Sequence, residues 1–377
     1  MTLAIMLAGG GTGGHVFPLL AIAEALRSLS SDCRLLFVGT RRGLESGIVP
    51  AKGYSIEFLD IRPIRGVGFA GALRGASRAI AALPESVRLL ARFLPDVVLS
   101  VGGYAAGPVT LAAWAQGIPT ALLEPNSEMG LSNRCLASLV DRAYTAFEPV
   151  ERHFGVSRVL RAGVPLRSGF SPRPWAVHAG PLRLLVLGGS QGASALNESV
   201  PAAASLSQIP IEIMHQCGNA HVDRVHDIYK NLGLPNVSVL PFIEDMPGAI
   251  GWADVVVSRS GASAISEICA IGRASILIPY PFAAGAHQHK NAMVLAQSGA
   301  AFCLDSKSAT PDNIRDKLVQ LAKNSDSIMQ MSQSSQRLGR PNAAFAIAED
   351  LLQIAKAKRA RGNQNGPSSS VAPRAEA

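Results

Sequence analysis

One pattern occurs twice in this chain and constrains its fold more than any other feature: a short apolar strand, a glycine-rich turn and then a helix. The first copy runs from the apolar residues 3–8 into the turn 9–15, and the second from residues 182–187 into the turn 188–193. Further apolar strands alternate with helices in both halves, which is typical of parallel sheets covered by helices. The sequence therefore predicts an α/β fold with two Rossmann-like, doubly wound parallel-sheet domains that face each other across a cleft.

Length and composition agree with a two-domain globular protein. The 377 residues exceed what one core usually holds, and 48% of them are hydrophobic while only 16% are charged. No uncharged apolar run reaches the ~18 residues of a spanning helix, and residues 1–6 lead into a strand rather than a signal peptide, so we expect a cytosolic protein. The five cysteines form no C-x-x-C pair. We therefore expect reduced thiols, without a disulfide framework or a zinc site.

The first glycine-rich turn offers backbone N–H groups to an anion. Gly9, Gly11 and Gly14 match the spacing of a dinucleotide-binding fingerprint, but the next strand ends at Thr40 without the acidic residue that would hold a ribose. No Lys-Ser or Lys-Thr pair follows the glycines, which excludes a P-loop. His15 is the titratable side chain of this turn and can be either structural or catalytic.

The stretch 254–291 carries the most informative polar groups of the second half. An apolar strand at 255–257 leads through a turn of small residues into a helix with Glu267, and a strand at 275–279 leads to a loop with Gln288. Free N–H groups suit a diphosphate, a carboxylate suits ribose hydroxyls and amides suit sugar hydroxyls. Together these groups predict a nucleotide-sugar site, although either half alone could be an ordinary βαβ unit.

Two more strands of the first half end in polar turns, one at Gly103 and Tyr104 and the next at Glu124 and Asn126. Because parallel strands end at the same edge of a sheet, these turns should line the cleft beside the first turn. The chain has no Asp-x-Asp triplet and no cluster with metal-ligand spacing. We therefore expect no metal ion and no cofactor, and a diphosphate leaving group that is stabilised by helix N-termini and backbone amides.

The basic residues suggest an anionic partner, since the formal net charge is +8. Residues 61–93 mix arginines with apolar side chains and contain a single acidic residue, Glu85. Part of this stretch fits a core helix, and the rest can lie on anionic lipid with its arginines at the headgroups. A solvated helical face would usually carry more glutamates, so we favour the membrane surface. Nucleic acid is not expected, because the basic residues are dispersed and lack an aromatic stacking pattern.

Several motifs taken together carry a resemblance to a known family. They are residues 7–15, 102–104 and 188–193 and, in order, residues 259–262, Glu267 and Gln288. Over about residues 3–355 the chain resembles glycosyltransferase family 28, whose MurG-type members are peptidoglycan N-acetylglucosaminyltransferases of the GT-B fold.

The resemblance implies an enzyme of peptidoglycan synthesis and cell-wall biogenesis, linked to cell shape, cell division and the cell cycle. Its reaction would be inverting, metal-independent transfer of N-acetylglucosamine from UDP-GlcNAc to the C4 hydroxyl of lipid I, undecaprenyl-pyrophosphoryl-MurNAc-pentapeptide, which gives lipid II. The enzyme would be peripheral at the cytoplasmic face of the cell inner membrane, with the anionic membrane surface and other cell-wall synthesis proteins as partners. The basic apolar stretch from Ile64, with Trp114, would lie against the membrane.

Carried over position by position, the resemblance implies roles for individual residues. His15 is the candidate general base, Glu267 would accept hydrogen bonds from the ribose and Gln288 would contact the sugar. The backbone of Ile243 would meet the uracil, and Ser190 would meet a phosphate. The donor-binding set comprises Thr12, Gly13, Gly14, Asn126, Arg167, Ser190, Ile243, Ala262, Ser263, Ala264, Ile265, Ser266, Glu267 and Gln288. The acceptor diphosphate set comprises Gly11, Gly103 and Tyr104.

The chain departs from the family pattern at three positions. It has Leu123 and Pro125 where the family usually has His and Gln, and Val164 where the family has Asn. These three side chains cannot form the hydrogen bonds that His, Gln and Asn form in the family. The departures therefore weaken the site assignment near Pro125 more than they weaken the assignment of function. A UDP-GlcNAc 2-epimerase and a non-catalytic nucleotide-sugar binder are the alternatives. The basic apolar stretch argues against the first, and an inert His15 substitution would favour the second.

The predicted domain boundaries follow a pause in the strand pattern near residue 163. Residues 1–163 would form an N-terminal, acceptor-binding and membrane-facing domain, and residues 164–340 a C-terminal domain that binds UDP-GlcNAc. We expect residues 341–358 to form a helix that packs back on the N-terminal domain. Residues 359–377, rich in Gly, Pro, Ser and charge, would be a disordered tail.

Overall fold

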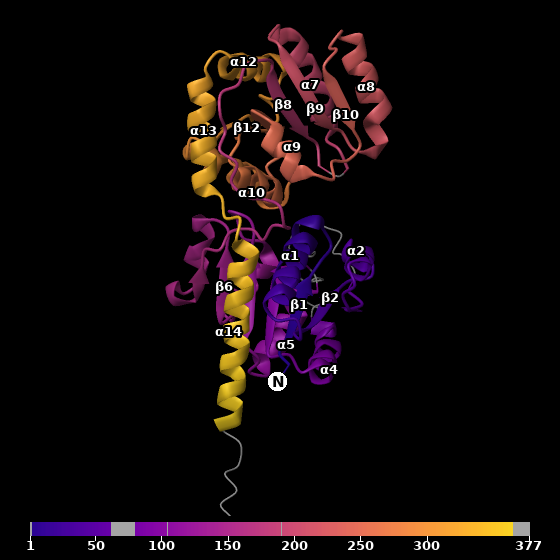
Figure 1. Ribbon diagram of the computed structural model, residues 1–377. Helices are drawn as coiled ribbons and strands as arrows, with labels where there is room; N and C mark the ends of the chain where they lie inside the picture. Colours follow the sequence, from indigo (N-terminus) through magenta and orange to yellow (C-terminus); the bar gives the residue numbers. More distant parts are fainter. Residues whose placement is uncertain (1, 62–79, 104, 190, 365–377) are drawn as a thin grey trace, which may run out of the picture.

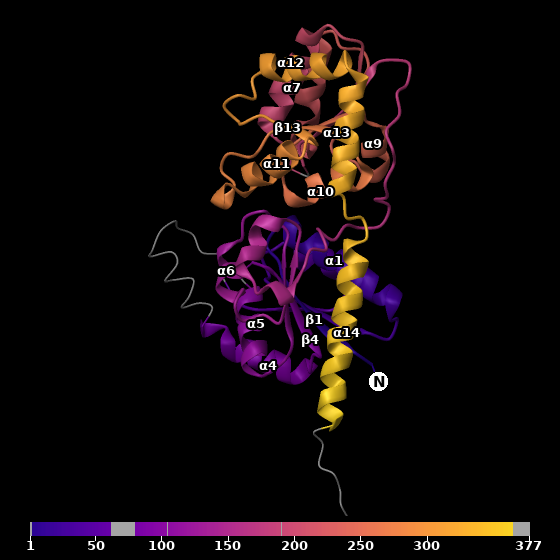
Figure 2. The same cartoon turned by 90° about the vertical axis from the view of Figure 1, so that its left-hand side faces the viewer.

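The structure consists of two bodies, each built on a parallel sheet, and a last helix that returns along the N-terminal body (Figures 1 and 2). The computed structural model describes residues 2–61, 80–103, 105–189 and 191–364. Tyr104, Ser190 and most of the basic apolar stretch lie outside the described residues.

The N-terminal body contains a seven-stranded sheet, within the described residues, in the order β3-β2-β1-β4-β5-β6-β7, with all strands parallel. The strands are β1 (Ala4–Gly9), β2 (Arg34–Gly39), β3 (Ile56–Phe58), β4 (Val97–Gly102), β5 (Thr120–Glu124), β6 (Arg142–Thr145) and β7 (Val159–Leu160). Strands β1 and β4 are buried throughout, as expected for a parallel sheet covered on both faces. Their register shifts after Ala8, so that Gly9 pairs with Gly102 and the two glycine-rich turns lie side by side.

Helices cover this sheet and bury their apolar positions against it. They are α1 (Gly13–Leu29), α2 (Glu45–Ala51), α4 (Leu83–Phe93), α5 (Ala106–Ala115), α6 (Leu131–Leu136) and the short turns η1 (Glu148–His153) and η2 (Val156–Arg158). In α1, the apolar side chains of Val16, Leu19 and Leu26 are 1% exposed or less. Helix α1 therefore starts at the edge of the sheet where the predicted site lies.

The C-terminal body repeats this arrangement, with a parallel sheet in the order β10-β9-β8-β11-β12-β13. Its strands are β8 (Leu182–Leu187), β9 (Ile211–Gln216), β10 (Val237–Leu240), β11 (Val255–Ser258), β12 (Ala274–Leu277) and β13 (Ala301–Cys303). Its helices are α7 (Ser194–Ser207), η3 (Asn219–His221), α8 (Val222–Asn231), α9 (Met246–Trp252), α10 (Ala262–Ile271), η4 (Ala284–Ala286), α11 (His287–Gln297), α12 (Pro311–Ala322) and α13 (Ser325–Leu338). The predicted fold of two Rossmann-like, parallel-sheet domains is confirmed.

Helix α14 (Ala343–Gln364) leaves the C-terminal body and packs along α1 of the N-terminal body (Figure 1). Its apolar face is part of the same core as β1, because Ile347, Ala348 and Leu351 are fully buried there. The guanidinium of Arg359 binds the carboxylate of Asp96, with N–O distances of 2.6 and 2.7 Å. The prediction of a disordered tail is therefore wrong for residues 359–364, since this ion pair holds the helix beyond its predicted end. Residues 365–377 lie outside the described residues.

Asp350 fixes α14 to β6 through a partly buried network. Its carboxylate accepts hydrogen bonds from Arg142 Nε and Tyr144 Oη, both at 2.7 Å. Replacing Asp350 by alanine leaves a buried phenol and a guanidinium without this partner, so we expect about 2 kcal/mol lower free energy of unfolding. Urea denaturation would measure the loss. Glu349→Ala, at an exposed position of the same helix, is the matched control, and equal effects of the two substitutions would contradict the prediction.

Candidate functional site

The first glycine-rich turn places His15 at the start of α1 with one ring nitrogen already bonded. His15 Nδ1 lies 3.0 Å from the carbonyl oxygen of Gly10. Since a carbonyl oxygen only accepts, the bond assigns the hydrogen to Nδ1 and the lone pair of the neutral ring to Nε2. The first N–H groups of a helix have no intrahelical acceptor, and Thr12 and Gly14 at the start of α1 are exposed. The turn thus combines a proton acceptor with anion-binding groups.

The turn after β4 packs directly on the first turn. Gly102 and Gly103 have φ angles of 105° and 86°, a region that side chains rarely tolerate. A Cβ on Gly103 would lie 2.7 Å from the carbonyl oxygen of Gly10. The structure therefore brings together the two turns that the sequence predicted at one edge of the sheet.

Glu124, at the end of β5, shapes the loop that follows it. Its carboxylate is 2% exposed and accepts hydrogen bonds from Asn126 N at 3.0 Å and Asn133 Nδ2 at 2.8 Å. It also accepts a bond from Gly130 N at 3.3 Å. Burial raises the pKa of Glu124, and these hydrogen bonds oppose the increase. Asn126, a predicted donor-binding residue, is held in place by this carboxylate.

The same loop contacts the C-terminal body through an interdomain clasp, which consists of Asn126, Ser127, Ser260 and Asn291. Asn291 is fully buried, and its Oδ1 accepts hydrogen bonds from both N and Oγ of Ser127 at 2.8 Å. Its Nδ2 donates to Asn126 Oδ1 at 3.3 Å and to the carbonyl oxygen of Ser260 at 3.2 Å. One amide therefore joins the predicted sites of both bodies. Local sequence does not reveal this role of Asn291, because its partners in the N-terminal body, Ser127 and Asn126, lie 164 and 165 positions away.

Replacing Asn291 by alanine should loosen the two bodies. The substitution leaves buried polar groups of Ser127 and Ser260 without a partner, at a cost of about 1–3 kcal/mol for each group. We expect a larger radius of gyration in solution scattering and roughly tenfold lower kcat/KM, because the site spans both bodies. Asn231→Ala, the same change at an exposed position of α8, is the control. Unchanged scattering of the Asn291 variant would show that the clasp does not hold the bodies.

On the C-terminal body, α10 starts at Ala262 after Gly261, and its first N–H groups have no side-chain cap. One turn later, burial raises the pKa of Glu267 to about 7, and the positive charge of the exposed Arg167 opposes this increase. The side chain of Ile265 is 1% exposed and packs in a core, so only its backbone can meet a ligand. The segment thus places uncapped N–H groups and a carboxylate within the first two turns of α10.

The side chain of Gln288 and the backbone of Ile243 each use one of their hydrogen-bonding groups for a contact within the protein, which leaves a single kind of group free for a ligand. Gln288 Oε1 accepts a hydrogen bond from Tyr280 N at 2.9 Å, which directs its NH₂ group as the remaining donor. Ile243 N donates to Gln216 Oε1 at 3.2 Å. Of the Ile243 backbone, only the carbonyl oxygen is then left for a uracil.

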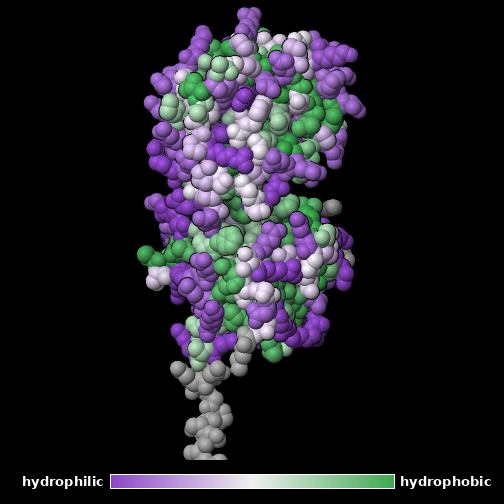
Figure 3. All heavy atoms as spheres, in the orientation of Figure 1, coloured by the Kyte–Doolittle hydropathy of each residue, from purple (hydrophilic) through white to green (hydrophobic). Residues whose placement is uncertain are grey.

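A cavity of about 410 Å³ lies between the two bodies, and in Figure 3 the outline narrows where the bodies meet. Its volume falls within the range of small-molecule pockets. Ile265 and Ser266 of α10 line it together with Phe147 and Arg161 of the N-terminal body and Arg340, which precedes α14. Of the predicted site residues only Ile265 and Ser266 line this cavity. His15, Asn126, Glu267 and Gln288 are not among its lining residues.

Comparisons with known proteins agree over nearly the whole chain. The glycosyltransferase family 28 N-terminal domain matches residues 5–145, and the glycosyltransferase family 28 C-terminal domain matches residues 183–347. A relative from Sorangium cellulosum is named UDP-N-acetylglucosamine--N-acetylmuramyl-(pentapeptide) pyrophosphoryl-undecaprenol N-acetylglucosamine transferase. It is 46% identical, over 95% of this chain and 90% of the relative. This chain belongs to glycosyltransferase family 28.

Further members of family 28 extend the comparison. A relative of the same name from Aeromonas hydrophila is 39% identical over 94% of this chain and 98% of its own. The crystal structure of Acinetobacter baumannii MurG matches with a TM-score of 0.80 and 31% identity, over 94% of this chain and 100% of that one. The predicted resemblance and glycosyltransferase class are confirmed. A UDP-GlcNAc 2-epimerase from Neisseria meningitidis, at a TM-score of 0.63 and 14% identity, shares the fold alone.

The departures from the family 28 pattern lie at buried positions. Leu123 is fully buried in the core around β1, and Val164 is 1% exposed among apolar residues of the second body. Pro125 is buried as well, beside Glu124. Val164 also lines the interdomain cavity, while Asn126 remains in the clasp.

The structure also brings together three potential metal ligands that spacing in the sequence did not reveal. Ligand atoms of His289, Cys303 and Asp305 all lie within 4.8 Å of one another. They come from α11 and from the end of β13, so their proximity depends on the fold. However, His289 Nδ1 already pairs with Asp305 Oδ1 at 2.8 Å. Burial raises the pKa of the Cys303 thiol to about 11, which disfavours the thiolate that a metal needs.

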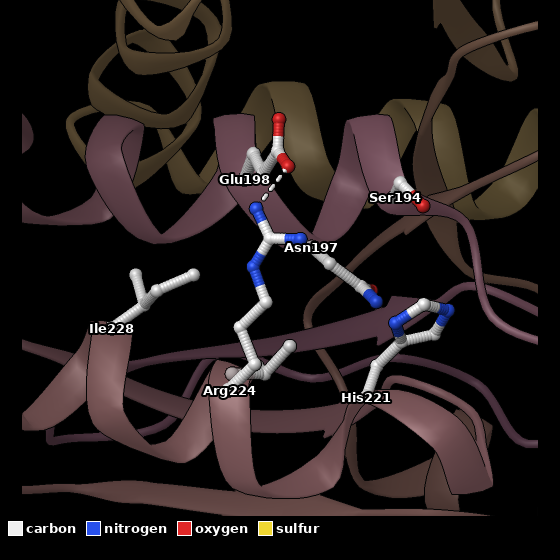
Figure 4. A pocket seen from close by; sticks show the side chains of 7 residues that line it. Ser194, Asn197, Glu198, His221, Arg224 and Ile228 are labelled. Carbon is white, nitrogen blue, oxygen red and sulfur yellow. Dashed lines mark hydrogen bonds and ion pairs between the residues drawn. The ribbon is translucent and has the colours of Figure 1, made fainter.

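A second hollow, between α7 and α8, is too small for a substrate. Figure 4 shows Ser194, Asn197, His221 and Ile228 around it, with the Glu198–Arg224 ion pair at 2.6 Å across it. Its volume of about 10 Å³ is that of a single water molecule. The interdomain region is therefore the better candidate for the active site of this family 28 chain.

Proposed function

We propose that this family 28 glycosyltransferase transfers N-acetylglucosamine from UDP-GlcNAc to the C4 hydroxyl of lipid I, forming lipid II for peptidoglycan synthesis. The observation that carries the proposal is the 46% identity, over 95% of the chain, to the relative named for this reaction. The facing sites of the two bodies support it, because they supply a proton acceptor on one side and nucleotide-binding groups on the other.

In the proposed reaction, His15 Nε2 accepts the proton of the acceptor hydroxyl. The hydroxyl oxygen forms a bond to C1 of N-acetylglucosamine, while the bond from C1 to the UDP oxygen breaks on the opposite face, so the configuration inverts. The negative charge that develops on the diphosphate is stabilised by the N–H groups that start α10 and by its helix dipole. No metal ion takes part in this scheme.

The proposed donor contacts use groups from both bodies. Glu267 accepts hydrogen bonds from the ribose hydroxyls, and Arg167 lies close enough to affect its charge. Gln288 donates its NH₂ group to the sugar, and the Ile243 carbonyl accepts from the uracil. The remaining predicted donor contacts, including Ser190 at a phosphate, stay as proposals from the family resemblance. The same holds for Gly103 and Tyr104 at the acceptor diphosphate.

Incubation of the purified protein with radiolabelled UDP-GlcNAc and a lipid I analogue in EDTA tests the function. We expect the label in a disaccharide lipid. Label that stays in UDP-GlcNAc although the nucleotide sugar binds would contradict the proposal and favour a non-catalytic binder. Conversion to UDP-N-acetylmannosamine would instead identify an epimerase.

We also propose that the enzyme acts as a peripheral protein on the anionic cytoplasmic face of the inner membrane. Within the described ranges, no helix is long and apolar enough to cross a bilayer. Exposed apolar side chains of the N-terminal body, Ile80, Leu94 and Trp114, together with the net charge of +8, support contact with anionic lipid. Co-sedimentation with anionic but not neutral vesicles would test it. Other cell-wall synthesis proteins are proposed partners at this surface.

A further inference from the structure

Glu45 is a buried carboxylate beneath the first glycine-rich turn. It is the first residue of α2 and is 1% exposed. Its Oε2 accepts a hydrogen bond from Gly11 N at 2.7 Å, and its Oε1 accepts bonds from Thr40 N at 2.8 Å and Thr40 Oγ1 at 3.0 Å. A carboxylate from the connection after β2 thus reaches back 34 positions to the turn after β1.

Three glycines make room for this carboxylate. A Cβ on Gly10, Gly39 or Gly43 would lie 2.2, 2.5 or 2.0 Å from a side-chain atom of Glu45. None of the three has a left-handed φ angle, so space for the carboxylate, rather than backbone strain, requires glycine there. The turn therefore encloses Glu45 closely.

One peptide plane connects Glu45 to His15. The N–H of Gly11 and the carbonyl of Gly10 belong to the same peptide bond, which is planar and trans, so they point in opposite directions. Glu45 holds the N–H end at 2.7 Å, and His15 Nδ1 donates to the carbonyl end at 3.0 Å. A charged acceptor at the N–H also polarises the peptide and strengthens its carbonyl as an acceptor.

We propose that Glu45 is a positioning residue for the transfer reaction, which holds His15 through the Gly10–Gly11 peptide. The chain of carboxylate, peptide and imidazole keeps the hydrogen on Nδ1 and presents the Nε2 lone pair to the acceptor hydroxyl. This inference rests on the proposed role of His15 as the base. The N–H of Gly11 is occupied by Glu45, so the predicted contact between Gly11 and the acceptor diphosphate cannot use this N–H.

A double-mutant cycle tests the inference, with Glu45→Gln, His15→Ala and the double variant. The amide of Gln cannot accept hydrogen bonds from both Gly11 N and Thr40 N, so the peptide that holds His15 should shift. Because this displaces the base, we expect Glu45→Gln to lower kcat about 30-fold. The KM for UDP-GlcNAc should stay within about twofold, because the nucleotide lies on the other body. In the His15→Ala background the same change should lower the residual kcat less than about threefold.

Two outcomes of the cycle would overturn the inference. One is a wild-type kcat in Glu45→Gln. The other is a loss of activity on adding Glu45→Gln to His15→Ala that equals the loss on adding it to the wild type. Either result would mean that Glu45 does not act through His15. Glu57→Gln, the same substitution at a surface ion pair on β3, is the matched control and should keep the wild-type kcat.

Nuclear magnetic resonance with ¹⁵N-labelled histidine gives a readout that is independent of turnover. We expect the His15 ring, assigned by its loss in His15→Ala, to be the Nδ1–H tautomer in the wild type and a mixture in Glu45→Gln. The same tautomer in both proteins would contradict the inference. If wild type fails to transfer sugar, the proposed function fails, while the spectra still decide the role of Glu45. If Glu45→Gln does not fold, Glu45→Asp, whose shorter side chain cannot reach both partners, replaces it in both experiments.

Discussion

Replacement of His15 by alanine is expected to lower kcat for sugar transfer by about 1,000-fold, within the range that general base catalysis contributes. The physical reason is that Nε2 is the available proton acceptor at the start of α1, since Nδ1 donates to the Gly10 carbonyl at 3.0 Å. Without a base, the acceptor hydroxyl must attack as a neutral nucleophile. The KM for UDP-GlcNAc should change by less than about twofold, because the loss is confined to the transition state.

Steady-state kinetics with a lipid I analogue measure this effect. His226→Ala, at an exposed position of α8, is the control, and it should keep the wild-type kcat. Full activity of the His15 variant would exclude the imidazole as the base. If both proteins bound UDP-GlcNAc and neither transferred the sugar, a nucleotide-sugar binder would become the better description.

Replacement of Glu267 by alanine is expected to raise the KM for UDP-GlcNAc by about 100-fold, since hydrogen bonds to a charged group contribute roughly 1.5–3 kcal/mol each. In the proposed complex its carboxylate accepts bonds from the ribose hydroxyls, so the effect should appear in donor binding while saturating donor restores most of kcat. Calorimetric titration of UDP-GlcNAc would measure the affinity. Glu198→Gln, on the exposed surface of α7, is the control, and an unchanged donor affinity of Glu267→Ala would remove Glu267 from the site.

The pH dependence of donor binding follows from the same carboxyl group. Burial raises the pKa of Glu267 to about 7, so the group changes from protonated to ionised between about pH 6 and pH 8. Because the ionised form accepts both ribose hydroxyls, donor affinity of the wild type should increase over this interval. Glu267→Gln should bind donor weakly at both pH values, without this increase.

Stability should change with pH in the opposite direction. The folded-state pKa of Glu267 lies above its unfolded value of about 4.3, so the protonated form favours the folded state. This contribution is complete below about pH 4 and is lost as pH rises through about 7. Glu267→Gln, which cannot ionise, should therefore lose less stability than the wild type between pH 5 and pH 8 in urea denaturation. At pH 8 we therefore expect Glu267→Gln to be more stable than the wild type and to bind UDP-GlcNAc more weakly. This combination would show that the carboxylate serves donor binding rather than folding.

Much of the fold could be predicted from the sequence because the relevant signals are local. Apolar runs such as those of β1 and β8, each followed by a glycine-rich turn and a helix, define strand, turn and helix within about 25 consecutive residues. Parallel strands place their carboxyl ends at one edge, which is why the sequence predicts that His15, Asn126, Glu267 and Gln288 belong to facing sites. The family resemblance supplied their individual roles.

The end of α14 shows where local signals fail. Composition predicts disorder from Arg359 onward, yet the helix continues to Gln364. The reason is tertiary: Arg359 meets Asp96, which lies 263 positions earlier in the chain. The same limit applies to Leu123 and Val164, whose burial in apolar cores the sequence did not indicate.

The sequence by itself determined the two α/β domains and the glycine-rich turns at their strand ends, since each depends on local pattern and on the common direction of parallel strands. Only the tertiary structure decided that Glu45 binds the N–H of Gly11 and that Asn291 joins Ser127 across the two bodies. These contacts depend on strand order and on how the bodies meet. Neither is encoded in the spacing of neighbouring residues, because folding brings together groups that are 34 and 164 positions apart.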